Sequence, residues 1–287
     1  MKIAYLITAF GNYHHLRRLL KALSDETKPS FYLHIDKKSP LPENLNDIEN
    51  LFFIKRRKVW WGGWSHLDAI LSLMKEASKS SFDYYVLLSG ADYPIRPNSF
   101  LYKKLQEGGE YINIIEGFQS HKPEKRIKYY YFDCFDRRDL YSYKTKLFLT
   151  LENSMRKVFI KKKYPFDKIY HGSTWWALSH FSVQYILKVI ESNSLLIRFF
   201  KTSWCPEESL IPTILGNAPL NLKFKNNLTY TDWNCYPPPA IINKNHLDLF
   251  SKEHSFTSVY GNYHPFFARK FNDDSNEVIR EIDLKLR

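Results

Sequence analysis

The sequence predicts an α/β fold with an open, mostly parallel twisted sheet and helices on both of its faces. Two observations predict it: short apolar runs of strand length recur through the first ninety residues, and amphipathic helical patterns lie among them. The apolar runs are continuous rather than alternating, which is typical of parallel strands buried on both faces. Strand and helix alternate four times, as in an open sheet with right-handed crossovers.

Each element is assigned from its own pattern. The four expected strands of the first half are 2–10, 31–36, 51–55 and 84–89. Helices are expected where apolar residues recur at three- and four-residue spacing, at 13–24, 66–79 and 181–191. Beyond these we expect a loop entering a strand at 172–179, an alternating strand at 227–234 and a terminal helix at 276–286.

The chain is interpreted as one domain, residues 1–287, with an inserted lid at 117–170 where the regular pattern loosens. The insertion is aromatic and basic and ends in the run Lys161-Lys162-Lys163. We interpret that run as a solvated face. The alternative is that residues 141–166 lie on an anionic membrane surface.

The composition supports a large core and an anionic partner. Hydrophobic residues make up 44% of the chain and aromatic residues 17%, which excludes a disordered protein. The formal net charge of +12 indicates nucleic acid, a phosphate-bearing ligand or an acidic membrane. Nucleic acid is not supported, because zinc-finger spacing, a helix-turn-helix signature and an RRM motif are all missing from the sequence.

Cysteine usage and hydropathy predict a cytoplasmic protein, either soluble or peripheral at the inner face of the membrane. The three cysteines, Cys134, Cys205 and Cys235, form no C-x-x-C pair and are interpreted as reduced thiols. The N-terminal run is too short for a signal peptide, and no apolar stretch approaches the ~20 residues that span a bilayer.

Ligands of open α/β sheets bind at the carboxyl ends of the strands. This rule selects Asp36, the loop Trp61-Gly62-Gly63 and the loop 90–94. There is no G-x-G-x-x-G and no G-K-S/T, which disfavours both a dinucleotide-binding Rossmann site and a P-loop, so a bound nucleotide would need another geometry.

The stretch 204–209 places two adjacent carboxylates at a helix start. Pro206 is favoured at the first helical position, so Glu207 and Glu208 fall in the first turn. Pro212 cannot donate a hydrogen bond to the carbonyl of Glu208 and is expected to kink the helix there. An ionised carboxylate beside a distorted turn suits a general base, although acids are also ordinary residues at a helix start.

A diphosphate ligand would need cations or a metal ion, and no Asp-x-Asp occurs anywhere in the chain. Arg269-Lys270 is the candidate pair, since a guanidinium binds two phosphate oxygens and an ammonium adds a point charge. Such a pair is more often surface than site. Its apolar neighbours in 266–271 indicate that this backbone is buried.

Seven motifs in order resemble glycosyltransferase family 14, the core-2/I-branching β-1,6-N-acetylglucosaminyltransferases and peptide O-xylosyltransferases. They are LHIDKKS (33–39), WGGWS (61–65), LSGADYPIR (88–96), GSTWWALS (172–179), CPEES (205–209), NLTYTDWN (227–234) and FFARKF (266–271). Two of them, LSGADYPIR and FFARKF, look closest to the xylosyltransferases. The resemblance covers residues 3–275, matches 117–165 poorly, and implies a GT-A fold, inversion at the anomeric carbon and independence of metal ions.

The resemblance also implies roles for individual residues. Glu208, the acid before Ser in P-x-E-S, matches the catalytic base. The implied donor-binding residues, for UDP, are Asp36, Trp61, Gly63, Arg269 and Lys270. The implied acceptor-binding residues are Asp92, Thr174, Trp175, Glu207, Asp232 and Trp233. By strand alternation, Trp176 points away from Trp175 and is expected in the core.

Two departures from the family pattern bear on these implied roles. The xylosyltransferases carry an acid where this chain has Thr174, which puts a peptide acceptor in doubt. The sequence also lacks the N-terminal anchor of Golgi members, which suggests a bacterial enzyme.

The predicted function is an inverting, metal-independent transfer of a sugar from a UDP-sugar to a hydroxyl of a glycan, lipid-linked glycan or protein-linked glycan. N-acetylglucosamine or xylose is favoured as the donated sugar, and no cofactor or divalent metal is expected. A glycoside hydrolase is disfavoured, because adjacent acids on a helix point apart instead of flanking a bond. The alternative from another class is a non-catalytic basic protein that binds carbohydrate or nucleic acid.

Overall fold

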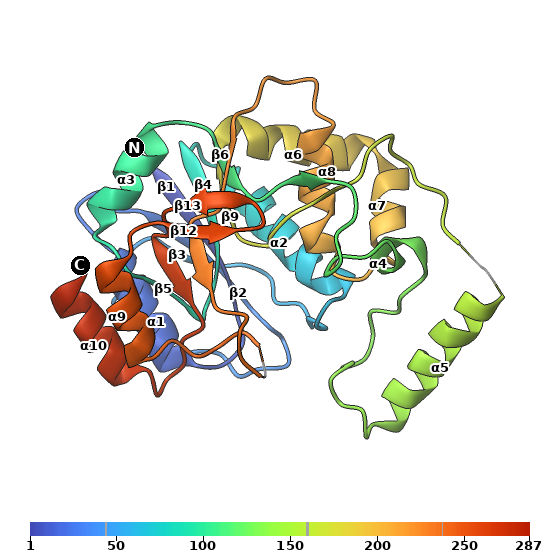
Figure 1. Ribbon diagram of the computed structural model, residues 1–287, viewed down its shortest axis with the longest axis horizontal. Helices are drawn as coiled ribbons and strands as arrows, with labels where there is room; N and C mark the ends of the chain where they lie inside the picture. The colour runs from blue at the N-terminus through green and yellow to red at the C-terminus, as the bar shows by residue number, and fades with distance from the viewer. Residues whose placement is uncertain (44, 159–160, 237) are drawn as a thin grey trace.

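The computed structural model describes residues 1–287 except 44, 159–160 and 237. Its centre is a seven-stranded sheet with the strand order β10-β6-β9-β4-β1-β2-β3 (Figure 1). The strands are β1 (Ile3–Ala9), β2 (Ser30–Ile35), β3 (Leu51–Phe53), β4 (Tyr84–Ser89), β6 (Glu110–Ile112), β9 (Trp176–Ser179) and β10 (Phe224–Lys225). Only β9 runs antiparallel to its neighbours. This is the open, mostly parallel GT-A-type sheet that the sequence predicted.

Strand β1 shows why continuous apolar runs form the middle of this sheet. Successive side chains of a strand point to opposite faces. Tyr5 and Ile7 accordingly join one hydrophobic cluster, while Ala4 and Leu6 join the other. All four are essentially unexposed, so a polar residue at any of them would lie in the core.

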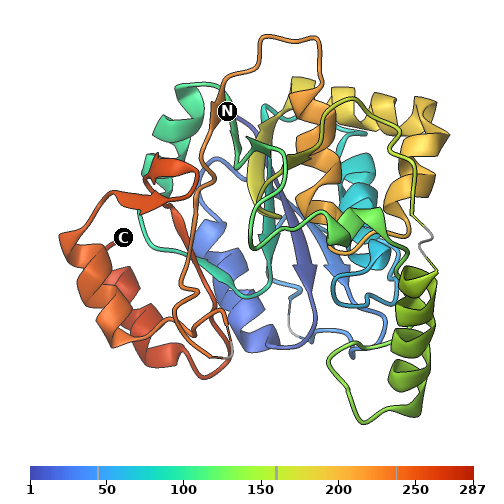
Figure 2. The ribbon, with the colours of Figure 1, turned by 45° about the vertical axis from the view of Figure 1, so that its right-hand side comes forward.

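Helices cover both faces (Figure 2). One face carries α1 (Tyr13–Leu23), α3 (Asn98–Gln106), α9 (Lys244–Lys252) and α10 (Asn276–Lys285). The other carries α2 (Trp64–Ala77), α6 (His180–Ser192), α7 (Ser194–Phe200) and α8 (Leu210–Gly216). The strands and helices expected in the first half and at the C-terminus are therefore confirmed to within about two residues at most ends.

A second, three-stranded sheet lies beside the main one, in the order β11 (Thr229–Thr231), β14 (Phe267–Arg269), β5 (Asp92–Pro94). Its register sets Arg269 opposite both Asp92 and Thr231. The predicted burial of 266–271 is confirmed, because Phe266, Phe267, Ala268 and Phe271 are unexposed. A two-stranded hairpin of β12 (Phe256–Ser258) and β13 (Gly261–Tyr263) follows α9.

Residues 117–170 run between β7 (Ile115–Glu116) and β8 (Tyr170–His171), which pair antiparallel, so this segment leaves and rejoins the body at one place. It holds α4 (Lys125–Lys128) and α5 (Tyr143–Lys157). Helix α5 stands apart from the sheet layers at the lower right of Figure 1.

The prediction that residues 161–163 form a solvated face is wrong for the middle residue. Lys162 is buried, and its Nζ donates to the Phe199 carbonyl (2.8 Å) and to the Ser203 hydroxyl (2.7 Å). Burial lowers the pKa of Lys162 to about 7. Three lysines in a row generally indicate a solvent-exposed segment. Here exposure alternates along 161–163, and the middle side chain points inward to the Phe199 carbonyl of α7 and the Ser203 hydroxyl that follows α7.

Candidate active site

The stretch 204–209 forms a tight turn followed by a short helix. Cys205 has φ 48°, and its N–H donates to the carbonyl of Gly62 (2.7 Å). The 3-10 helix η1 (Pro206–Glu208) then begins at Pro206, as predicted, with both acids in its single turn.

The expected kink at Pro212 is wrong. The chain breaks at Ser209, and a separate helix, α8, begins at Leu210, so Pro212 lies in its first turn where no N–H is required. The Glu208 carbonyl instead accepts a hydrogen bond from the Gly172 N–H (2.8 Å). A strand-end loop thus supplies the donor that Pro212 cannot.

The Glu208 carboxylate is bound by two cations of the inserted segment. Its Oε2 lies 2.7 Å from Arg126 Nη1 and 3.2 Å from Lys122 Nζ. Lys122 is buried and also donates to the Gly172 carbonyl, so it joins the loop to the carboxylate. These two cations were missed from the sequence, where the run HKPEKR (121–126) was the only signal for them.

Glu207 faces a different environment from Glu208. Its Oε1 lies 3.2 Å from His66 Nδ1 on α2, and its buried Oε2 has no hydrogen-bond partner among the described residues. Burial, with a smaller effect of Glu207, raises the pKa of nearby Asp133. The two adjacent acids therefore point apart, as expected from their positions on a helical turn.

Arg269 is held between an aromatic ring and an acid. Its guanidinium carbon lies 4.3 Å from the centroid of the Trp175 ring, and its Nε lies 3.5 Å from Asp92 Oδ1. Burial lowers the pKa of Arg269 and raises that of Asp92. Asp92 is completely buried and accepts hydrogen bonds from the N–H and hydroxyl of Ser89. The structure therefore places Asp92 as the support of Arg269, away from any open acceptor surface.

The loop 172–175 brings Glu208 and Arg269 together. Gly172 binds the Glu208 backbone, and Trp175, three residues later, stacks on Arg269. Three residues span at most about 10–11 Å, so the loop keeps the Glu208 backbone and the ring that stacks on Arg269 in one part of the molecule. A Cβ on Gly172 would lie 1.8 Å from the carbonyl oxygen of Asn113, so only glycine fits here.

Asp36 lies at the end of β2 and is mostly enclosed by backbone donors. Its Oδ1 accepts from the N–H groups of Lys38 (2.9 Å) and Val59 (3.3 Å). Lys38 Nζ lies 3.5 Å from Asp36 and 4.2 Å from the centre of the Trp60 ring. Asp36 therefore anchors a loop that carries a cation over an aromatic ring.

Lys270 follows Arg269 and is half-buried. Burial, with repulsion from Arg269 and Arg138, lowers its pKa. Arg138 belongs to the inserted segment, which thus reaches the basic pair as well as Glu208.

The loop 61–63 packs against the stretch 204–209. Trp61 is half-exposed and meets the Trp204 ring edge-on at 5.0 Å. A Cβ on Gly63 would lie 1.9 Å from the Asp133 carboxylate, so glycine is required for that close approach. This loop therefore supports the turn that carries the two acids.

The remaining predicted acceptor residues differ in exposure. Trp233 is 66% exposed, and Asp232 accepts from the Asn234 N–H (2.8 Å) and lies 3.1 Å from His246 Nε2. Hydrogen bonding, first from Asn234, lowers the pKa of Asp232. Among the described residues, no hydrogen bond or ion pair joins Asp232 or Trp233 to Glu208. Thr174 is half-buried next to Trp175, and Trp176 lies in the core, as predicted.

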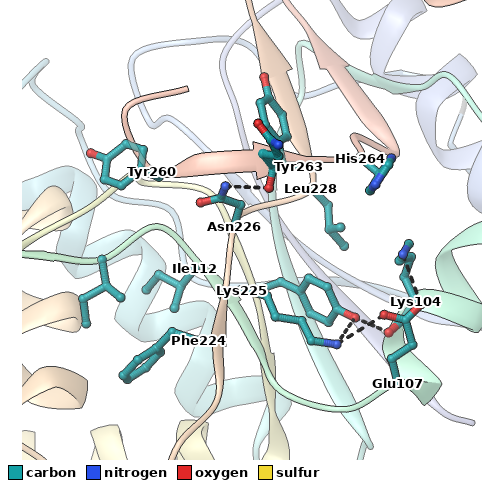
Figure 3. A pocket seen from close by; sticks show the side chains of 13 residues that line it. Lys104, Glu107, Ile112, Phe224, Lys225, Asn226, Leu228, Tyr260, Tyr263 and His264 are labelled. Carbon is teal, nitrogen blue, oxygen red and sulfur yellow. Dashed lines mark hydrogen bonds and ion pairs between the residues drawn. The ribbon is translucent and has the colours of Figure 1, made fainter. Parts of the chain in front are cut away.

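A cavity of about 400 Å³ lies elsewhere, between the edge strand β10, its neighbour β6 and the β12–β13 hairpin (Figure 3). Its lining includes Phe224, Asn226, Tyr260, Tyr263 and His264, and none of the residues selected from the sequence. Asn227, which lies between the lining residues Asn226 and Leu228, connects the cavity to the loop 172–175. Its N–H donates to Asn113 Oδ1, and its Nδ2 donates to Ser173 Oγ.

Comparison with known proteins supports the resemblance seen in the sequence. The family model of the Core-2/I-Branching enzymes matches residues 3–259. Xylosyltransferase 2 of Mus musculus is 28% identical over 98% of this chain and 33% of its own length. Xylosyltransferase 1 of Rattus norvegicus is 26% identical over all of this chain and 35% of its own length. This chain thus spans about a third of the length of these relatives.

Among solved structures, mouse Xyloside xylosyltransferase 1 in its apo form aligns with a TM-score of 0.37 at 11% identity, over 93% of this chain and 97% of that one. The family match covers most of the strands and helices that build the site. The chain belongs to the Core-2/I-Branching enzyme family.

Proposed function

We propose that this protein is a glycosyltransferase that moves a sugar from a UDP-sugar to an acceptor hydroxyl with inversion and without a metal ion. One observation carries the proposal: the loop 172–175 holds Glu208 at one end and Arg269 at the other. A base and a cation that face one region are the two groups that such a transfer requires.

Glu208 is the proposed general base. The acceptor oxygen attacks C1 of the sugar, the bond from C1 to the diphosphate oxygen breaks on the opposite face, and the acceptor proton passes to the carboxylate. Both cation contacts of Glu208 go to Oε2. Oε1 is therefore the proposed proton acceptor, with Lys122 and Arg126 fixing the orientation of the carboxylate.

Arg269 and Lys270 are the proposed partners of the departing diphosphate. Arg269 is buried, and its Nε is ion-paired with Asp92 Oδ1 at 3.5 Å but makes no hydrogen bond among the described residues. Lys270 is repelled by Arg269 and Arg138, so an anion that enters there relieves that repulsion. Within the described residues, no cluster of three or more His, Cys, Asp or Glu is arranged to hold a metal ion. The side chains of Arg269 and Lys270 are the proposed source of positive charge.

The donated sugar is proposed to be xylose or N-acetylglucosamine. The relatives named above are xylosyltransferases, which makes UDP-xylose the first donor to test. The acceptor is proposed to be a glycan, free or linked to lipid or protein, and Asp232, Trp233, Thr174 and Glu207 remain proposed contacts to it.

The test is UDP release from each donor in the presence of EDTA, combined with thermal unfolding with and without UDP. If a donor site is present, UDP raises the unfolding temperature. UDP at 100 times its Kd adds about 2.7 kcal/mol to the free energy of unfolding. Stabilisation by UDP that survives EDTA, with turnover of one donor, supports the proposal. No stabilisation by UDP favours a non-catalytic binding protein, and stabilisation that EDTA abolishes contradicts metal independence.

A further inference from the structure

Helix α5 presents two different faces. The inner face packs on the preceding part of the inserted segment through Thr145, whose hydroxyl donates to the Asp136 carbonyl, and through Phe148, which stacks on Phe135 at 5.3 Å. Glu152, on the same face, is completely buried and pairs with Arg137. These contacts fix the rotation of α5, and therefore fix which side chains point outward.

The outward face is apolar. Tyr143, Leu147 and Leu151 recur at four-residue spacing, and all three are exposed, Tyr143 by 80%. Leu140, shortly before the helix, and Val158, directly after it, are also exposed, at 60% and 66%. A soluble helix normally turns such a stripe to the core. Here the core-facing side is already occupied by Thr145, Phe148 and Glu152, so the stripe needs another partner.

Cations border the stripe on both sides. At 100° per residue, exposed Lys144 lies on one side of it, and exposed Lys146 and Lys157 lie on the other. Residues 137–163 contain nine Lys or Arg and only two Asp or Glu, a formal net charge of +7, of which Lys162 is buried and Arg137 and Arg138 are paired with Glu152 and Asp136. The two acids are engaged elsewhere, because Glu152 is buried and Asp139 accepts from the backbone N–H groups of Tyr141 and Ser142.

We propose that the outward face of α5 binds the surface of an anionic lipid bilayer. An apolar stripe flanked by lysines is the pattern of a helix that lies in the plane of a membrane interface. Acyl chains would cover the apolar side chains, and acidic headgroups would pair with the lysines. A second copy of this chain fits less well, since it would bring the same cations together. A nucleic acid would leave the apolar stripe in water.

The inner face of α5 connects this surface to the candidate active site. Glu152 pairs with Arg137, and the Arg137 guanidinium lies 4.7 Å from the centre of the Trp204 ring. Trp204 begins the stretch that carries Glu208. Helix α5 and the Glu152–Arg137 pair therefore lie between a bilayer on the outward face and Trp204. The membrane proposal does not depend on the proposed chemistry, because lipid binding is measured without substrate.

The experiment is sedimentation of the intact protein with vesicles of phosphatidylcholine alone or mixed with phosphatidylglycerol, at low and high salt. We expect binding only to the mixed vesicles, weakened by salt because part of it is electrostatic. Leu147→Ser/Leu151→Ser should lose about tenfold or more of the partitioning, since it removes the apolar contact. Lys146→Gln/Lys157→Gln should lose roughly 20- to 30-fold, since each lysine contributes on the order of a fivefold effect near an anionic surface.

The control is Leu284→Ser, which removes a leucine from α10, on another part of the molecule, that is more exposed (79%) than Leu147 (45%) or Leu151 (43%). It should bind like the wild type. Because all of these side chains are exposed, circular dichroism and the unfolding temperature should stay unchanged and show that the variants fold. Wild-type protein that stays in the supernatant with mixed vesicles at low salt would overturn the proposal. So would equal binding of the Leu147/Leu151 variant, or a wild-type dimer that this variant disrupts.

Discussion

Ion-paired groups lie at both ends of the loop 172–175. The group proposed to meet the substrate is a cation at one end and a carboxylate at the other. At one end, Asp92 is completely buried and supports Arg269, which is the group proposed to meet the substrate. At the other end, Lys122 and Arg126 support Glu208, whose side chain remains 25% exposed. Asp92 and Lys122 are each less exposed than the group they contact, whereas Arg126 (22%) is about as exposed as Glu208. Burial therefore marks Asp92 and Lys122 as supports of the proposed reacting groups.

The sharpest test of this comparison is Glu208→Gln. Loss of a positioned base should lower kcat by about 10²- to 10⁴-fold, while UDP still stabilises the protein, because the basic pair is untouched. UDP release and thermal unfolding measure the two effects separately. Glu207→Gln is the matched control and should lose far less, since the amide can keep the contact with His66. Similar losses in both variants would contradict the assignment of Glu208.

A buried charge with no carboxylate partner among the described residues should behave differently from both of these sites. Lys162 has a pKa of about 7 in the folded protein, below its ordinary value, so the unfolded chain binds more protons between the two pKa values. Stability should therefore rise as pH increases from about 7 to 10, by on the order of 4 kcal/mol. Denaturant unfolding of the wild type and Lys162→Met at both ends of this range measures the effect.

The methionine variant should lose this rise with pH and be more stable relative to wild type at the lower pH than at the higher one. Lys163→Met, at an exposed neighbouring lysine, should keep the wild-type slope. The same slope in all three proteins would show that burial of Lys162 has no energetic consequence.

Arg269→Ala removes the functional half of the buried pair. We expect UDP affinity to fall by roughly 10- to 100-fold, the value of hydrogen bonds to a charged group. Asp92 would then be buried without its cation, so the unfolding temperature should fall as well. Isothermal titration with UDP measures the first effect. Unchanged UDP affinity in a folded Arg269→Ala protein would exclude Arg269 from the donor site.

Arg126→Gln removes one support of Glu208 and should have the smallest effect. We expect kcat to fall by about tenfold, because Lys122 still holds Oε2, and UDP affinity to stay unchanged. Steady-state UDP release over a range of donor and acceptor concentrations separates the two. A weaker donor affinity with unchanged kcat would assign Arg126 to the UDP side instead.

The sequence was most informative where local pattern and burial agree. The apolar runs at β1, β2 and β4 and the leucine spacing of α1 predict their elements, because both faces of the central strands lie in the core. The segment 117–170 could not be predicted in this way. Its aromatic and basic residues follow no single period, and its partners lie far away in the chain, such as Trp204 for Arg137.

The residues of the candidate site also divide into those that local sequence selects and those that depend on distant contacts. Motif order selected Glu208, Asp36 and the basic pair, and the position of Pro206 predicted the helical turn that separates the two acids. The sequence could not identify Lys122 and Arg126, because their contact with Glu208 spans more than eighty residues. It also could not place Asp92 beneath Arg269, since that depends on the pairing of β5 with β14.

By itself, the sequence determined an α/β protein with two adjacent acids at a helix start, a basic pair on a buried strand and a family resemblance. These features depend on the spacing of neighbouring residues, which the chain contains directly. Tertiary structure decided which acid meets cations, which acid supports Arg269, which lysine of 161–163 is buried and which face of α5 stays outside. Each of these depends on burial and on distant partners, and both exist only once the sheet has formed.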